Sequence, residues 1–249
     1  MRVVISNTDW HNCPCGGEAY TGYFDFIRTD RGDLPAFVYT DTTSKQKPKF
    51  IGEASAHEAG HTLGLRHDGT TTGDAYYSGH GVWAPIMGVS YDLPVTQWSK
   101  GEYPNANNQE DDLTIISRGG APRLADDYVG TASTTVTLPA GTTRQGKIEG
   151  TGDTDAFKFT LTTTRTLQIK LISGIGAGPD LNSRVVIKTA GGTTKVTASP
   201  TDTLGASFVT TLPQGSYVTY VSGVGEGTVS TGYSAYASLG NYRLTLTFQ

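Results

Sequence analysis

Three histidines and one glutamate are spaced in a way that could bind a metal ion and do chemistry with it. Residues 57–67 read His-Glu-Ala-Gly-His-Thr-Leu-Gly-Leu-Arg-His. On a helix, His57 and His61 are four residues apart, so both imidazoles project from one face. Gly64 ends such a helix and lets the chain turn, so that His67 approaches from another direction. Three neutral imidazoles with an open fourth position describe a catalytic zinc site rather than a closed structural one.

Glu58 supplies the second part of this chemistry. It is rotated about a quarter turn from the histidine face of the helix, so it reaches a water beside the metal rather than the metal itself. The sequence therefore predicts hydrolysis with Glu58 as the general base, which passes the proton to the leaving amine without a covalent intermediate. The alternative is a set of ordinary helix histidines. It requires that three of the chain's five histidines fall on ligand positions by chance.

The pattern from His57 to His67 resembles the extended zinc signature of the metzincin metallopeptidases, which also carry a methionine-containing turn downstream of the third histidine. Pro85-Ile86-Met87-Gly88 follows here, and Met87 is the only methionine besides Met1. The resemblance implies that Met87 forms a hydrophobic floor under the ligands and is not itself a ligand. Asp68 follows the third histidine, as in the reprolysin-like branch, and is expected to orient the local backbone.

The same resemblance suggests residues that contact the substrate. Some metzincins have a tyrosine two residues after the methionine that reaches the metal or the oxyanion. Tyr91 follows Met87 by four residues, so it is a candidate for that role, with a half-buried loop aromatic as the alternative. Trp98 and Tyr103 lie where metzincins form the wall of a substrate pocket, and structural packing is the alternative for both.

Short strands and one long helix must position these side chains. The helix is predicted from the apolar pattern after Pro48 and ends at Gly64. A second helix is expected to begin at Asn107 or Asn108, with acidic residues in its first turn. The predicted strands are Arg2–Ser6, Ala19–Phe24 and Pro35–Thr40. Metzincins normally have a strand, a long helix and a second strand before the strand matched by Arg2–Ser6. The resemblance therefore implies an α+β catalytic domain that is N-terminally truncated, with its substrate-pairing edge at Gly16–Phe24.

The composition changes near residue 120, where residues 118–123 read as a linker. Residues 1–120 are predicted to be the zinc peptidase domain. Residues 121–249 are rich in Thr, Val and Gly and alternate apolar with polar residues, which predicts an antiparallel β-sandwich. The alternating apolar residues are Phe157, Phe159, Leu161, Leu167, Ile169, Leu171, Tyr242, Leu244, Leu246 and Phe248.

The second domain resembles the bacterial prepeptidase C-terminal (PPC) domain. The residues that carry this resemblance are Ala125-Asp126-Asp127-Tyr128, Gly152-Asp153-Thr154-Asp155-Ala156-Phe157-Lys158-Phe159 and Asn241-Tyr242-Arg243-Leu244-Thr245-Leu246. Such domains are sandwiches attached to secreted peptidases, and some bind calcium or a polymeric substrate. Here Asp126, Asp127, Asp153 and Asp155 could hold a hard cation such as Ca²⁺. The favoured alternative is that these residues stabilise turns.

Charge, hydropathy and cysteine content restrict the function further. A net charge of -4 gives no basic surface for nucleic acid, and no apolar run has the roughly 18 residues of a membrane-spanning helix. The N-terminus lacks the pattern of a signal peptide, so an extracellular location rests on the family resemblance alone. Cys13 and Cys15 are too close in sequence to form a good disulfide. They are expected to be free thiols or partners of cysteines elsewhere. His11 has no partner at ligand spacing, and His80, in Ser-Gly-His-Gly, is expected to be a loop residue.

Together these features predict a secreted zinc-dependent endopeptidase that acts on a protein or peptide substrate, with the sandwich as an accessory module. The alternative is a non-catalytic binding protein with a degenerate or truncated peptidase half, which uses the sandwich for attachment. Glu58 discriminates between them, and its presence favours the enzyme.

Overall fold

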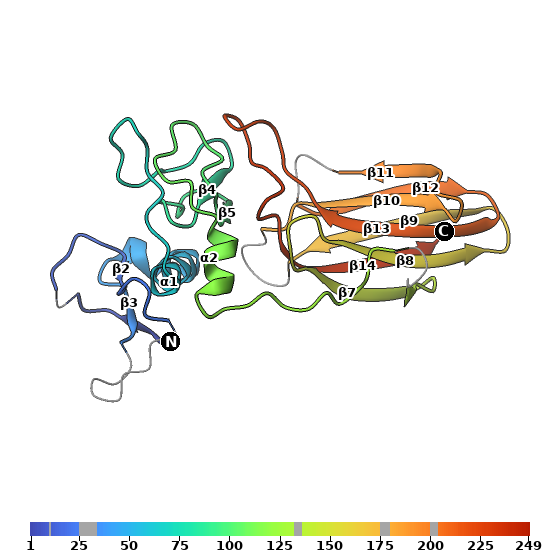
Figure 1. The fold of residues 1–249 in the computed structure, drawn as a ribbon. Coiled ribbons are helices and arrows are strands. Elements are labelled where there is room, and N and C mark those ends of the chain that lie inside the picture. The colour runs from blue at the N-terminus through green and yellow to red at the C-terminus, as the bar shows by residue number, and fades with distance from the viewer. Residues whose placement is uncertain (10, 25–33, 132–135, 175–179, 200–203) are drawn as a thin grey trace. The chain divides into compact units, whose positions relative to one another are not determined.

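A computed structural model describes residues 1–9, 11–24, 34–131, 136–174, 180–199 and 204–249. The chain is mostly β, with few helices, and forms two compact units (Figure 1). The first comprises Met1–Arg123 together with Thr228–Tyr233, and the second comprises Leu124–Gly227 and Ser234–Gln249. No helix in the described ranges is long and apolar enough to cross a membrane.

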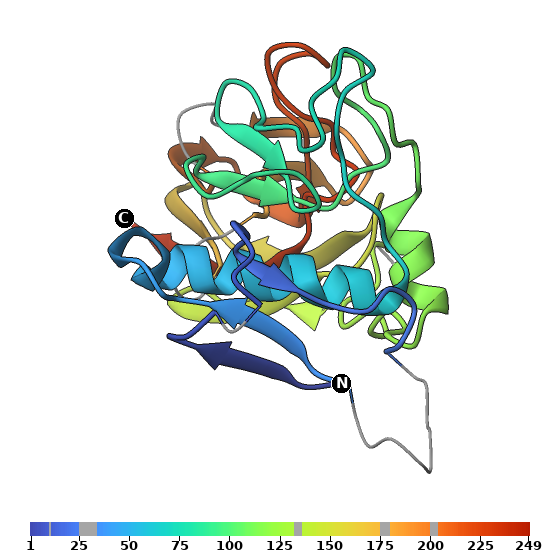
Figure 2. The same cartoon turned by 90° about the vertical axis from the view of Figure 1, so that its left-hand side faces the viewer.

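The first unit contains a three-stranded sheet in the order β1-β3-β2. Strand β1 (Val3–Ser6) pairs in parallel with β3 (Ala36–Tyr39), and β2 (Gly17–Glu18) pairs antiparallel with the other side of β3. Ala36, Val38 and Tyr39 of β3 are fully buried and Phe37 is half-buried, so both faces of this central strand are covered. Helix α1 (Pro48–Leu63) lies along this sheet (Figure 2). Strand β2 is therefore an edge within the region predicted to bind substrate.

The prediction of a strand at Ala19–Phe24 is wrong, because β2 ends before that range begins. Pairing stops after Glu18, and the chain then runs past the last turn of α1. The backbone N–H of Gly22 donates to the carbonyl of His61 at 2.9 Å, and that of Phe24 donates to Thr62 at 2.8 Å. Carbonyls in the last turn of a helix have no partner within the helix. They accept the N–H groups that a longer strand would have used.

Helix α1 follows the sequence prediction at both ends. Pro48 occupies its first turn, where the missing N–H costs nothing. Gly64 ends it in the left-handed conformation at φ 110°, which glycine adopts without a Cβ clash. A short 3-10 helix, η1 (Thr43–Gln46), precedes it. The boundaries of α1 thus fix where His57, Glu58 and His61 lie on its surface.

The second helix begins later than predicted. Helix α2 spans Asp112–Arg118, and Asp111 caps it by accepting from the Thr114 N–H at 3.0 Å. Asn107 and Asn108 instead hold the loop that follows His67, through Gly69 and the Arg66 and His67 carbonyls. Two short parallel strands, β4 (Trp83–Pro85) and β5 (Val95–Gln97), complete the unit.

The second unit is a β-sandwich, as the alternation predicted. One sheet has the order β11-β10-β13-β8-β6 and the other β12-β9-β14-β7. All described pairings are antiparallel except β6 with β8. The strands are β6 (Val136–Thr137), β7 (Thr142–Ile148), β8 (Thr154–Leu161), β9 (Arg165–Ser173), β10 (Ser183–Thr189), β11 (Thr194–Ala198), β12 (Ala206–Leu212), β13 (Gly215–Gly223) and β14 (Gly240–Phe248).

The apolar side chains of the two sheets face one another and form the core of the second unit. Phe157 and Ile187 come from one sheet, and Ile169 and Leu244 from the other. None of the four is exposed to solvent. Their polar neighbours along each strand point outward, which is the period-two pattern of a sandwich. Phe248, predicted to continue the series on the last strand, is 43% exposed at its end.

Candidate metal centre

The first two histidines lie on the buried side of α1. His57 and His61 are one turn apart, and their ring centroids are 4.8 Å apart in an edge-on arrangement. After the turn at Gly64 the chain returns, and the ring of His67 comes within 4.6 Å of His61 and 5.3 Å of His57. One nitrogen of each ring lies within 4.8 Å of the others. The structure thus brings together the three histidines singled out in the sequence.

Backbone carbonyls fix the orientation of two of these rings. His57 Nδ1 lies 2.8 Å from the Ile86 carbonyl oxygen, and His61 Nδ1 lies 2.8 Å from that of Leu65. A carbonyl oxygen only accepts, so Nδ1 carries the proton in both rings, and each Nε2 is left with a lone pair. The His61 Nε2 lies 2.9 Å from the Nε2 of His67. Ring nitrogens that carry lone pairs and lie this close together can ligate one divalent metal ion.

Burial keeps the three rings neutral. It lowers the pKa of His57 to about 3 and that of His67 to about 4, and in both cases the charge of His61 adds to the effect. The pKa of His61 is also lowered by burial. Metal ions bind imidazole in its neutral form. The donor set therefore fits zinc in number, type and protonation state.

Met87, predicted to form a floor under the ligands, lies close to helix α1. Its side chain is fully buried and packs with Leu65 and Ile86. The Met87 carbonyl accepts from the Asp68 N–H at 2.9 Å, which ties the turn to the segment after the third histidine. A Cβ built on Gly60 would lie 2.7 Å from the Met87 sulfur. Helix α1 can approach this methionine closely because position 60 has no side chain.

Glu58 is placed beside the histidines and is not one of the candidate ligands. It is 5% exposed, and its Oε2 has no hydrogen-bond partner among the described residues. Burial raises its pKa to about 8, and the negative charge of Glu18 on the edge strand adds to this. A carboxylate with a raised pKa and an unpartnered oxygen is suited to accept a proton. A Cβ on Gly17 would lie 2.8 Å from Glu58 Cγ, so the edge strand passes directly over this side chain.

A pocket of about 440 Å³ opens over these residues. One side is the chain entering β2, and the other is formed by the loops before and after β4. Tyr91 lines it, with its ring 4.2 Å from that of Phe50. Tyr76 also lines it, and its ring centroid is 4.3 Å from that of His67. The pocket lining comprises Pro14, Cys15, Gly16, Gly17, Glu18, Ala19, His57, Glu58, His61, His67, Tyr76, Gly88, Val89 and Tyr91.

Sequence reasoning missed Tyr76. It lies in a loop of Gly, Thr and Ser residues between the third histidine and Met87, where no periodicity marks one position above another. The adjacent Tyr77 has a different environment, since its hydroxyl hydrogen-bonds His80 Nδ1 at 2.7 Å. Of these two adjacent tyrosines, only Tyr77 has a hydrogen-bond partner for its hydroxyl among the described residues.

Trp98 and Tyr103 do not line the pocket. Trp98 packs against the apolar cluster of Leu65, Ile86 and Met87, and Tyr103 is 3% exposed, with its hydroxyl donating to the Gly69 carbonyl at 3.0 Å. Packing, the alternative for both, is what the structure shows. Asp68 is buried, and its main chain bonds Met87 and Tyr77, consistent with an orienting role.

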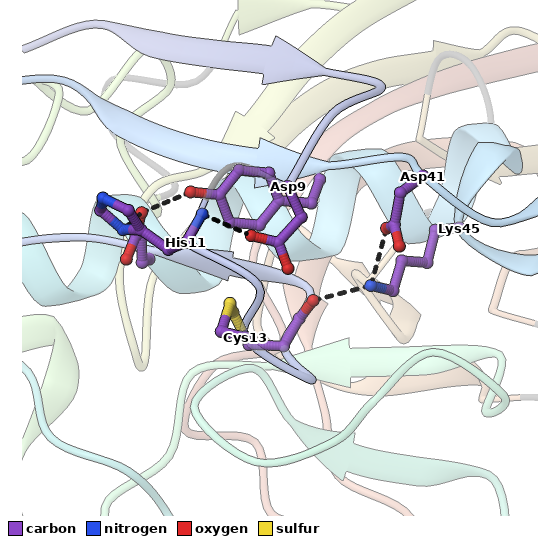
Figure 3. Close-up of a disulfide and its surroundings, with 8 residues drawn as sticks. Asp9, His11, Cys13, Asp41 and Lys45 are labelled. Atoms are coloured by element: carbon purple, nitrogen blue, oxygen red, sulfur yellow. Dashed lines mark hydrogen bonds and ion pairs between the residues drawn. A yellow bond between two sulfur atoms is a disulfide. The ribbon is translucent and has the colours of Figure 1, made fainter.

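A disulfide joins Cys13 and Cys15 at the rim of the pocket (Figure 3). The expectation that these cysteines do not pair with each other is wrong, because the chain folds back at Pro14 and brings their Cα atoms to 5.2 Å, within the usual range. The Lys45 ammonium donates to the Cys15 carbonyl at 2.8 Å and to Asp41 at 2.9 Å.

Glu18 is held on the same side of the unit as this loop. It accepts from the Tyr39 hydroxyl, and its carboxylate lies 2.5 Å from His11 Nδ1. The Asp9 side chain in turn accepts from the His11 N–H at 3.1 Å. His11, which has no ligand partner in sequence, therefore helps to anchor the edge strand.

The second unit gathers a separate set of carboxylates at one end of the sandwich. Oxygens of Asp126, Asp127 and Asp155 approach within 4.8 Å of one another, as do those of Asp126, Glu149 and Asp153. Glu149 was not anticipated. Asp155 has no exposed surface, and its Oδ2 accepts from the Tyr242 hydroxyl while its Oδ1 has no partner among the described residues.

The sequence matches no protein-family model and no curated protein. Among solved structures, the chain is similar to the pre-peptidase C-terminal domain of a Bacillus anthracis collagenase, with 16% identity, coverage of 45% of this chain and 94% of that one, and a TM-score of 0.35. It is also similar to PliG, a periplasmic inhibitor of g-type lysozyme. The Aeromonas hydrophila protein shares 14% identity over 50% of this chain and 100% of its own (TM-score 0.33), and the Salmonella Typhimurium protein 9% over 46% and 98% (TM-score 0.29). Likenesses at this level carry no functional argument.

Proposed function

We propose that this chain is a zinc-dependent endopeptidase with an α+β, metzincin-type catalytic unit. The observation that carries the proposal is the set of three neutral imidazoles, two of them oriented by backbone carbonyls, beside the unpartnered carboxylate oxygen of Glu58. His57, His61 and His67 would hold the metal. Zinc in such a site polarises a carbonyl and acidifies water.

Other residues of the chain would bind the substrate, transfer the proton and hold the histidines in place. An extended peptide would add to β2, which is the outer strand of the three-stranded sheet. Glu58 takes a proton from the attacking water and passes it to the leaving amine, so that a neutral product departs. Met87 would keep these rings in place indirectly, because its buried side chain packs with Ile86 and Leu65, whose carbonyls orient His57 and His61. Tyr91 lines the same pocket and is a candidate donor to the substrate.

The experiment measures bound zinc and the cleavage of casein and a quenched fluorescent peptide, with and without 1,10-phenanthroline. We expect about one zinc per chain and activity that the chelator removes. Glu58→Gln should retain zinc and lose activity by a factor on the order of 10² to 10⁴, since it keeps the shape and loses the base. A zinc-loaded wild-type protein that cleaves nothing would favour the alternative, a non-catalytic binding protein. Equal activity in Glu58→Gln would exclude the proposed base.

We further propose that the sandwich is a PPC-like accessory module of a secreted peptidase and that its acidic cluster binds Ca²⁺. Oxygen-only donors suit calcium. The specific observation is that Asp155 is fully buried and one of its carboxylate oxygens has no partner among the described residues. Burying such a group lowers the stability of the fold unless a cation or a proton compensates its charge. The disulfide between Cys13 and Cys15 supports an oxidising compartment.

Calcium binding is tested by titration calorimetry and by thermal unfolding in EDTA against Ca²⁺. We expect one saturable site and a raised unfolding temperature, both lost in Asp155→Asn and both kept in Glu226→Gln, which changes a carboxylate of the same unit outside the cluster. An identical response with and without Ca²⁺ would leave the aspartates as turn residues.

A further inference from the structure

Two tyrosines line the pocket of the candidate metal centre from different loops. Tyr76 precedes β4, whereas Tyr91 lies between β4 and β5. Among the described residues, neither hydroxyl makes a hydrogen bond. Each O–H is therefore free to donate to a group that binds in the pocket.

The two tyrosines are held differently. The ring of Tyr91 packs on Phe50, and its hydroxyl lies 2.9 Å from the position of a Cβ on Gly16. This places the Tyr91 hydroxyl against the segment that leads into the edge strand. Tyr76 is 43% exposed, and its ring lies tilted at 44° to that of His67. Tyr76 is thus the phenol that rests on a candidate metal ligand.

Glu58 lines the same pocket as the two tyrosines. The candidate general base and the two phenol rings therefore border one space. A phenol O–H in that position can donate to an acceptor bound in the pocket.

We propose that Tyr76 is a substrate-contacting residue whose phenolic O–H donates to the carbonyl oxygen of the bond that is cleaved. This inference rests on the proposed peptidase function and adds a residue to it. A donor aimed at an oxygen that gains negative charge stabilises the transition state more than the substrate. Tyr91, packed on Phe50 beside Gly16, then holds the peptide along the edge strand.

The decisive variant is Tyr76→Phe, which keeps the ring against His67 and removes only the hydroxyl. We expect kcat to fall by a factor on the order of 10² with KM nearly unchanged, as for the loss of one oxyanion donor. Zinc content should equal that of the wild type. Tyr77→Phe is the matched control, because it removes the neighbouring hydroxyl, which bonds His80 and does not line the pocket.

A binding measurement tests the same point without turnover. A phosphinic peptide, whose tetrahedral anion resembles the transition state, should bind zinc-loaded Tyr76→Phe on the order of 10² times more weakly than the wild type in calorimetry. The cognate substrate peptide should bind Glu58→Gln and the double variant Glu58→Gln/Tyr76→Phe equally.

The outcomes separate the two proposals. Loss of activity in Glu58→Gln together with full activity and full inhibitor affinity in Tyr76→Phe would keep the peptidase and overturn the role of Tyr76. A raised KM in Tyr76→Ala with normal Tyr76→Phe would show a wall for a substrate side chain and also overturn it. An equal loss in Tyr77→Phe would show that the order of the loop, rather than the hydroxyl, is what matters.

Discussion

Two glycines of helix α1 provide a matched test of the packing under the candidate metal centre. A Cβ on Gly60 would lie 2.7 Å from the Met87 sulfur, 3.2 Å from Trp98 and 3.3 Å from Leu65. A Cβ on Gly52 would meet nothing within 4 Å. Both positions lie inside the same helix, so Ala in place of Gly improves helix propensity by about 1 kcal/mol at each.

The gain in helix propensity is the same in Gly52→Ala and Gly60→Ala, so the difference in stability between the two variants measures the packing cost at position 60. Overpacking a filled core costs about 1–3 kcal/mol, and Met87 has no exposed surface through which to move away. We expect Gly52→Ala to stabilise the protein by about 0.5–1 kcal/mol. Gly60→Ala should be less stable than Gly52→Ala by about 1–3 kcal/mol.

Urea unfolding followed by tryptophan fluorescence makes this measurement on the intact chain. Trp83 and Trp98 lie in the first unit, and the sequence of the second unit contains no tryptophan, so the signal reports on the first unit. The slope m should stay constant while the midpoint moves. If the midpoint of Gly60→Ala equals or exceeds that of Gly52→Ala, the close contact between α1 and Met87 is not what limits this position.

Three further predictions concern the cap of α2, the buried Asp155 and the edge strand. Asp111→Ala removes the acceptor for the Thr114 N–H and should lower the free energy of unfolding by about 1 kcal/mol in the same urea assay; no change would mean that water replaces the cap. Burial raises the pKa of Asp155 from 3.8 to about 8. The folded state therefore holds the extra proton, and stability in EDTA should fall as pH rises across that interval, as calorimetry of the sandwich transition would show; a flat profile would contradict the shift. Gly17→Ala places a Cβ 2.4 Å from a backbone carbonyl oxygen and 2.8 Å from Glu58, so it should reduce peptide cleavage more than zinc content, and an unaffected enzyme would show that the edge strand can move.

The parts of the fold that the sequence predicts are those governed by local patterns. Helix α1 is bounded by Pro48 and Gly64, whose backbone preferences are strong and independent of tertiary contacts. The strands of the sandwich follow from period-two alternation, as in Leu167, Ile169 and Leu171, which are all buried. The spacing of His57 and His61 likewise predicts their arrangement, because a helix places residues four apart on one face.

The parts that the sequence does not predict depend on distant partners. The start of α2 moves to Asp112 because Asn107 and Asn108 are used to hold the loop after His67. Strand β2 ends at Glu18, and the N–H groups of Gly22 and Phe24 bond carbonyls at the end of α1 rather than a neighbouring strand. Tyr76 is adjacent to the site only through the path of its loop, and no residue spacing encodes that path.

The acceptors that orient His57 and His61 belong to the main chain, at Ile86 and Leu65. Main-chain carbonyls are present whatever side chain the position carries, so ordinary substitutions at these two positions leave the acceptors in place. The orientation of the two imidazoles is therefore insensitive to substitutions at positions 65 and 86. The packing around Met87 still limits which side chains these two positions can carry.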